Sequence, residues 1–137
     1  MIEGMKRIGN IMSEVVEYSN MYESYKQVLR GTKRKLSQSG QRIIQDTERI
    51  LTGLSESLAD GSFEISGYKD IDVVEGGKLR HIQVLSLRER IAINAVMRVV
   101  DKHLLPRYIR TTSASIVGRG MHDLMKYIRD DIRNDVD

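Results

Sequence analysis

A single proline, Pro106, in 137 residues constrains the fold more than any other feature of this sequence. Proline breaks helices, so a chain that nearly lacks it and is rich in Leu, Ile, Val and Met can sustain long helices. The length suits one globular domain with a real hydrophobic core. We therefore expect a single, mostly helical domain over residues 1–137, whose helical N-terminal part spans 1–60.

Two N-terminal segments carry apolar side chains at helical spacing. The first predicts one helix over residues 5–30, ended by Gly31. The second predicts a helix that begins near Gly40, because glycine is a poor helix residue, and ends before Gly61 in an Asp60-Gly61 turn.

The pattern changes to alternation after residue 62. Apolar residues alternate from Phe63 to Val74, Glu75-Gly76-Gly77 forms a strong turn signal, and Lys78 to Val84 alternates again. These features predict one β-hairpin with a break or bulge at Gly67. We expect one face to turn Leu79 inward, together with either His81 or its neighbours, and the other to present Lys78, Arg80 and Ile82.

The C-terminal part predicts two further helices. Ser86 and Glu89 form a capping box that begins a helix from Leu87 to about Leu105, which Pro106 limits. Residues 107–120 lack a helical period, and a last helix starts near Met121. The fold class is therefore α+β, with two N-terminal helices, a hairpin and two helices, the hairpin and later helices filling 61–137.

The net charge of +3 is small, but the cations cluster. Residues 30–49 and 78–110 are basic, whereas residues 50–77 are acidic with Lys69 as their one cation. The two blocks form either one phosphate-facing surface or ordinary solvated helix faces. From charge alone, we assign contact with an RNA backbone to the first block, at Arg30, Lys33, Arg34 and Lys35.

The sequence offers little support for a membrane partner or a metal site, and its support for phosphate binding is divided. There is no Cys and no apolar run of 18 residues, which favours a reducing, cytoplasmic location without a membrane partner. His81, His103 and His122 lack metal-ligand spacing, so we predict no metal site. The turn Gly118-Arg119-Gly120 either presents N–H groups and a guanidinium to a phosphate or simply enters a helix. The hairpin tip either closes over an anionic substrate or is a free charged hairpin.

The order of these features resembles a known family. A helix ends in the turn Ser57–Phe63, and a later Gly turn leads to the basic strand Lys78-Leu79-Arg80. The segment Arg88-Glu89-Arg90-Ile91 comes next and leads into the helical residues from Ala92. The last block, Ser113 to Leu124, contains Gly118-Arg119-Gly120-Met121-His122. The stretch Leu58–Asp131 is similar in this order to the N-terminal fingers region of bacterial reverse transcriptases of the group II intron, retron and diversity-generating type. It departs from that pattern at Glu89, Ala114 and Ile116.

The resemblance implies a role as the fingers of an RNA-directed DNA polymerase. Arg80, assisted by Lys78, would contact the triphosphate of an incoming deoxynucleotide. Gly118, Arg119, Gly120 and His122 would lie along the RNA template, paired with its primer. The palm carboxylates that hold Mg²⁺ in the complete enzyme are not among these residues, so we expect no catalytic residue, no cofactor and no polymerase activity in this chain alone. Apolar surface that would meet a palm predicts self-association.

Two other classes of function stay open. One is a stand-alone, non-catalytic RNA- or DNA-binding module without polymerase ancestry, using the same basic blocks. The other is a helical protein-interaction domain whose interface is formed by the N-terminal helices.

Overall fold

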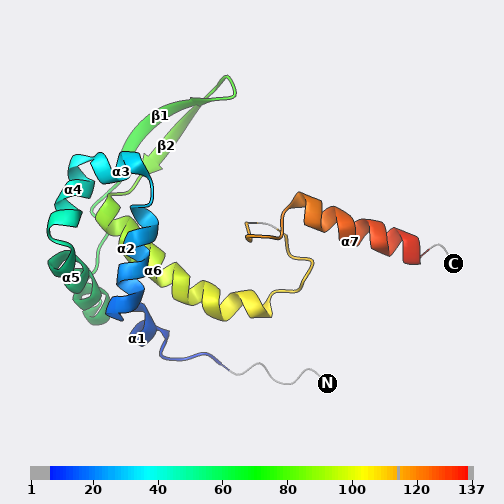
Figure 1. The fold of residues 1–137 in the computed structure, drawn as a ribbon, viewed down its shortest axis with the longest axis horizontal. Coiled ribbons are helices and arrows are strands. Elements are labelled where there is room, and N and C mark those ends of the chain that lie inside the picture. The colour runs from blue at the N-terminus through cyan, green and yellow to red at the C-terminus, as the bar shows by residue number, and fades with distance from the viewer. Residues whose placement is uncertain (1–6, 114, 136–137) are drawn as a thin grey trace. The chain divides into compact units, whose positions relative to one another are not determined.

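A computed structural model describes residues 7–113 and 115–135, which form two compact units divided between Lys102 and His103. Within the described residues there are seven α-helices and one two-stranded antiparallel sheet (Figure 1). The α+β prediction, with one hairpin between helical segments, is therefore confirmed.

The N-terminal part holds five short helices instead of the two predicted. They are α1 (Ile11–Val15), α2 (Tyr18–Val28), α3 (Thr32–Leu36), α4 (Gln38–Gln45) and α5 (Thr47–Asp60). Polar side chains donate hydrogen bonds to backbone carbonyls at two of the breaks between these helices. Between α1 and α2, Asn20 Nδ2 donates to the Val15 carbonyl. Between α4 and α5, Thr47 Oγ1 donates to the carbonyls of Ile43 and Ile44. These local hydrogen bonds compete with continuation of a helix.

A helix begins near Gly40, as predicted: α4 starts at Gln38, so Gly40 lies in its first turn. The helix is capped by Ser37, whose Oγ accepts from the Gly40 amide at 3.0 Å and donates to the Arg34 carbonyl at 2.7 Å. A Cβ at position 40 would lie 1.9 Å from the carbonyl oxygen of Arg34. Glycine is therefore required by the close approach of α3 and α4.

Gly40→Ala is expected to lower the free energy of unfolding by about 1–3 kcal/mol, because backbone must move to admit the methyl group. Gly53, within α5, is the matched control, since a Cβ there meets nothing within 4 Å. Gly53→Ala is expected to stabilise by about 0.5–1 kcal/mol through helix propensity. Urea denaturation of both variants checks the contrast, and an equal effect of the two would refute the packing argument.

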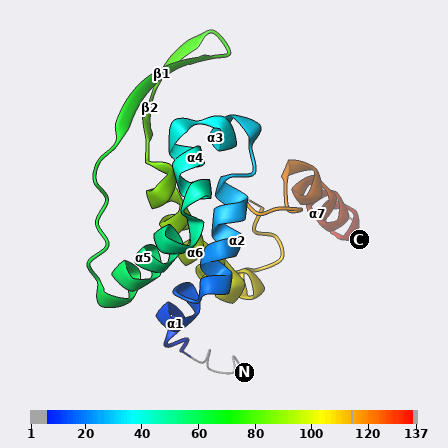
Figure 2. The ribbon, with the colours of Figure 1, turned by 60° about the vertical axis from the view of Figure 1, so that its left-hand side comes forward.

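The core of the first unit lies among α2, α4, α5 and α6 (Leu87–Leu104). Its fully buried members include Met21, Leu51, Leu54, Ile91, Ala92 and Ala95. Ser24 on α2 is also fully buried, and its Oγ donates to the Ile91 carbonyl of α6 at 2.6 Å. The small side chains at this contact allow α2 and α6 to approach closely, and Figure 2 shows the two helices crossing.

The hairpin consists of β1 (Lys69–Glu75) and β2 (Lys78–Val84), in a register that pairs Glu75 with Lys78 and Lys69 with Val84. Gly76 and Gly77, at φ of 58° and 76°, make the two-residue turn that the sequence predicts. A turn with positive φ at both positions matches the twist of the strands. The hairpin projects beyond the helices (Figures 1 and 2).

Two details of the hairpin prediction are wrong. Neither face is buried: Leu79, expected inward, is 60% exposed. The first strand starts at Lys69 rather than Phe63, because the preceding backbone donors are used elsewhere. The Phe63 amide donates to the Ser57 carbonyl, the Ser66 amide donates to Glu89, and Gly67 has a φ of 134°.

The second unit contains a 3-10 turn (Leu105–Arg107) that includes Pro106, an irregular segment, and α7 (Met121–Asn134). The predicted irregular stretch and the start of the last helix at Met121 are confirmed over the described residues; Ala114 lies outside them. Arg110 joins the loop to α7 through both oxygens of Asp123, at 2.7 and 3.2 Å, and lies over the Tyr127 ring. The helix has no buried residue.

Candidate nucleic-acid interface

A groove of about 520 Å³ lies between α3, the open end of the hairpin and the start of α6. We call this open end, where Gly67 and Lys69 lead into β1 and Val84 and Leu85 leave β2, the foot of the hairpin. An adjoining hollow of about 360 Å³ shares Arg34, Leu85 and Arg90 with it. The basic side chains that line the groove are Lys33, Arg34, Lys69 and Arg90. None of the described residues lining either space is acidic, so the groove is a concentrated positive surface.

Arg34 is held in place by the end of α2. Its Nη1 donates to the Val28 carbonyl at 3.0 Å, where the partial negative charge of a helix C-terminus favours a guanidinium. The Ser37 cap bonds the carbonyl of the same residue. These contacts fix α3 against α2 and α4, which places Lys33 and Arg34 at the groove. Two other residues assigned to the basic segment, Arg30 and Lys35, are exposed and do not line it.

Glu89 holds the two feet of the hairpin together. One carboxylate oxygen accepts from the amide and hydroxyl of Ser66, before β1, both at 2.6 Å. The other accepts from the amide and hydroxyl of Ser86, after β2, at 3.1 and 2.8 Å. The Glu89 amide donates a hydrogen bond to Ser86 Oγ at 3.3 Å, which confirms the predicted capping box.

These four hydrogen bonds stabilise the ionised carboxylate although Glu89 is only 3% exposed. They lower the pKa of Glu89 to about 2, Ser66 being the largest cause and burial opposing the shift. Adjacent residues on a helix point about 100° apart, so Glu89 is buried while its neighbour Arg90 reaches the groove. The Glu89 carboxylate is thus hydrogen-bonded within the protein and does not line the groove.

Lys78 and Arg80, the predicted nucleotide-binding residues, lie at the far end of the hairpin. The register places both on the same ladder face as Lys69, which lines the groove at the foot. The rise of a strand separates tip from foot by about 20 Å, so the two clusters are distinct. Arg80 Nε pairs with Glu75 Oε2 at 3.2 Å, and both side chains are largely exposed. Their nucleotide role stays a prediction.

The predicted template-binding residues Gly118, Arg119, Gly120 and His122 lie in the second unit, around the start of α7. Gly118 has a φ of 78°, a conformation that favours glycine. Arg119 Nη1 donates to the Ile109 carbonyl at 3.2 Å, and the Gly120 carbonyl accepts from the first turn of α7. These contacts fit a self-contained helix entry, and the phosphate role likewise stays a prediction.

The first turn of α7 also carries its own anion. Asp123 pairs with Arg110, and this contact lowers the pKa of Asp123 and raises the pKa of Arg110. A carboxylate near a helix N-terminus interacts favourably with the helix dipole. The first turn of α7 therefore carries a carboxylate whose charge is compensated by Arg110 of the same unit.

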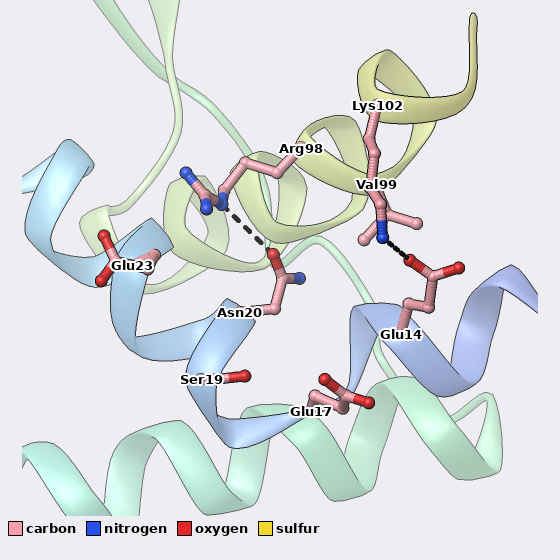
Figure 3. A pocket seen from close by; sticks show the side chains of 8 residues that line it. All are labelled: Glu14, Glu17, Ser19, Asn20, Glu23, Arg98, Val99 and Lys102. Atoms are coloured by element: carbon pink, nitrogen blue, oxygen red, sulfur yellow. Dashed lines mark hydrogen bonds and ion pairs between the residues drawn. The ribbon is translucent and has the colours of Figure 1, made fainter.

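A third cavity, of about 410 Å³, lies between α1, α2 and α6 (Figure 3). Asn20 joins these helices, donating to the carbonyls of Val15 and Ala95 and accepting from Arg98 Nε at 3.2 Å. Lys102 Nζ bonds Glu14 Oε2 at 2.6 Å, and this bond raises the pKa of Lys102. The polar groups of this cavity bond one another across helices, which is typical of a structural network.

Over residues 7–113 and 115–135, no group of three or more His, Asp or Glu side chains is arranged to hold a metal ion. His81 Nδ1 pairs instead with Asp72 across the exposed ladder. In the same part of the chain, no helix has the length and apolar character needed to cross a bilayer.

Sequence reasoning missed two of the four groove cations, Lys69 and Arg90. Lys69 is the lone cation of the acidic stretch and begins a strand, which was an available signal. Arg90 follows the capping glutamate and belongs to the second basic block, residues 78–110, but the sequence alone does not single it out as a binding residue. The fold brings both beside Lys33 and Arg34, which are far away in the sequence.

No known family model matches the chain, and no curated protein matches its sequence. The functional argument therefore depends on the chemistry of the groove.

Proposed function

We propose that this chain binds a single strand of nucleic acid by its phosphates, in the groove at the foot of the hairpin. The observation that carries the proposal is the set of four cations, Lys33, Arg34, Lys69 and Arg90, with no acidic side chain among the described lining residues. Guanidinium and ammonium groups are the side chains that contact phosphate most often. Ser39 adds a hydroxyl group to the lining. The hydroxyls of Ser37 and Ser86 already donate to the Arg34 carbonyl and to Glu89.

The test is binding of a fluorescently labelled single-stranded RNA, followed by anisotropy over a range of salt concentrations. Four phosphate contacts on a single strand predict an affinity that falls about 50-fold between about 50 and 200 mM salt. A single-stranded DNA of the same sequence shows whether the sugar matters. Affinity for both strands that is undetectable at about 50 mM salt, or independent of salt, would refute the proposal.

The finer proposal is that the chain is the fingers region of a reverse transcriptase. It is supported by the order of elements, in which a helix, a Gly-Gly hairpin, a capped helix and a Gly-Arg-Gly segment follow one another. RNA is then the natural strand for the groove. In this role Arg80 would exchange its pairing with Glu75 for a triphosphate, at small cost because exposed ion pairs contribute only about 0–1 kcal/mol.

Arg80→Ala in the complete polymerase is expected to raise the KM for deoxynucleotide about 10- to 100-fold with a smaller change in kcat, because it removes one charge-assisted contact of about 1.5–3 kcal/mol. Steady-state kinetics over a range of nucleotide concentrations measure this. His81→Ala is the matched control, since His81 lies on the opposite ladder face. An unchanged KM would remove Arg80 from the nucleotide role.

A second candidate function, protein interaction by self-association, is favoured by the exposed apolar stripe of α7. Met121, Met125, Ile128 and Ile132 are each about half exposed or more. Their 4-3-4 spacing forms one face of the helix. Light scattering at high protein concentration distinguishes the candidates, because a monomer that binds RNA supports the first and a dimer that does not bind RNA supports the second.

A further inference from the structure

The hairpin is joined to the rest of its unit only at its foot. In the described part of the chain neither β1 nor β2 packs against a helix, and every residue of the two strands except Val84 is exposed. Phe63 before the hairpin and Leu87 after it pack against the buried core. The direction of the projecting hairpin (Figure 1) therefore depends on the contacts made between these two anchors and the strands.

Glu89 supplies the side-chain contacts at this point. It is the one side chain outside residues 64–86 that hydrogen-bonds this segment, all of which is described. It bonds both sides of the foot at once, through Ser66 before β1 and Ser86 after β2, and it is itself buried. Gly67, which follows Ser66, restricts the backbone least of all residue types. The carboxylate is therefore the main restraint on how the hairpin leaves the helices.

Lys69 is the groove cation whose position depends on this restraint. It lies three residues after Ser66, at the start of the projecting strand, whereas Lys33 and Arg34 belong to α3 and Arg90 belongs to α6. The helices keep their own contacts when the hairpin moves. Loss of the Glu89 contact would therefore take Lys69 away from the groove and leave the three other cations in place.

We propose that Glu89 is a positioning residue for nucleic-acid binding, which fixes the direction of the hairpin and thereby holds Lys69 at the groove. The inference rests on the proposed function and deepens it, because it gives a buried anion a part in binding a polyanion. The expected effect is opposite in sign to that of charge alone. Removing a negative charge near four cations would strengthen the attraction for phosphate, whereas displacing Lys69 weakens it.

The test measures the affinity for single-stranded RNA, and its salt dependence, in Glu89→Gln, Lys69→Gln and the double variant. Each single variant is expected to lose about fivefold in affinity at low salt and about 0.7 in the slope of log affinity against log salt, the share of one phosphate contact on a single strand. The double variant is expected to bind as Glu89→Gln does, because Lys69 is already displaced. Independent effects would multiply to about 25-fold.

Ser66→Ala tests the same contact without changing any charge or the capping box at Ser86. It removes one hydrogen bond on the β1 side of the foot, so we expect an affinity loss of about twofold. Ser62→Ala is the matched control, because the Ser62 hydroxyl bonds the exposed carboxylate of Asp60 and not the foot, and it should bind RNA as the wild type does. Circular dichroism verifies folding at the titration temperature. If Glu89→Gln is unfolded there, Ser66→Ala and its double variant with Lys69→Gln decide.

The outcomes separate the inference from the proposed function. Unchanged or tighter binding by folded Glu89→Gln would overturn the positioning role and leave the phosphate groove standing. Losses that multiply in the double variant, or an equal loss in Ser66→Ala and Ser62→Ala, would also overturn it. A wild-type protein that does not bind the RNA would instead refute the proposed function.

Discussion

Glu89→Gln is expected to lower the free energy of unfolding by about 3 kcal/mol at pH 7. The carboxylate accepts four hydrogen bonds from Ser66 and Ser86, and these hold its pKa at about 2 against an ordinary value of 4.5. Glutamine keeps the shape, but its NH2 group would face donors where the carboxylate presents an oxygen. Urea denaturation of the two proteins measures the difference.

The effect of Glu89 also has a predicted pH dependence. Folding lowers the pKa of Glu89, so the carboxylate contributes fully to the free energy of unfolding above the unfolded pKa of 4.5. This contribution is lost as the pH falls towards about 2. The stability gap between wild type and Glu89→Gln should therefore close across this interval. Asp60→Asn is the control, since Asp60 also has a lowered pKa, from bonds to Ser62, but is exposed. A gap that does not change with pH would contradict the account.

Neutralising the groove is expected to have the largest effect on binding. In the triple variant Lys33→Gln, Lys69→Gln, Arg90→Gln, three of the four cations of the groove are removed, while Arg34, which also holds α3 to α2, is kept. We expect RNA affinity to fall about 100-fold at low salt, and the slope of log affinity against log salt to fall by about 2. Anisotropy titrations at several salt concentrations provide both quantities.

A second triple variant controls for net charge. Lys26→Gln, Arg42→Gln and Arg49→Gln remove the same charge from exposed positions of the same unit that do not line the groove. This variant should keep the wild-type slope and lose only a few-fold in affinity through the long-range field. If both triple variants lose affinity equally, binding depends on overall charge and not on the groove.

The features that the sequence predicts correctly are those specified by local chemistry. Ser86 and Glu89 define a helix start through their spacing alone, and Gly76-Gly77 defines the hairpin turn because two positive φ values favour glycine. The end of α5 at Gly61 and the start of α7 at Met121 follow from similar signals.

The failures concern tertiary contacts and competing hydrogen bonds. The first predicted helix breaks where Asn20 takes the Val15 carbonyl and also reaches α6, a contact that periodicity does not reveal. A helix does start near Gly40, but the sequence does not reveal why glycine is needed there, which is the close approach of the Arg34 carbonyl.

The groove could be predicted only in part for the same reason. The charge pattern identified Lys33 and Arg34, whereas Lys69 and Arg90 join them only because Glu89 ties both feet of the hairpin to the start of α6. The alternation of apolar and polar residues along the two strands also predicted a buried hairpin face. This pattern does not indicate whether other elements of the fold cover the hairpin. Here the ladder is exposed on both faces.

The most direct test of the central claim is an NMR titration of the isotopically labelled protein with a short single-stranded RNA. The account predicts saturable shifts of backbone amides concentrated at Lys33, Arg34, Lys69, Ser86 and Arg90, with little change on the exposed face of α5. Saturable binding whose shifts are confined to residues outside the groove, such as the loop before α7, would contradict it, as would a complete lack of shifts.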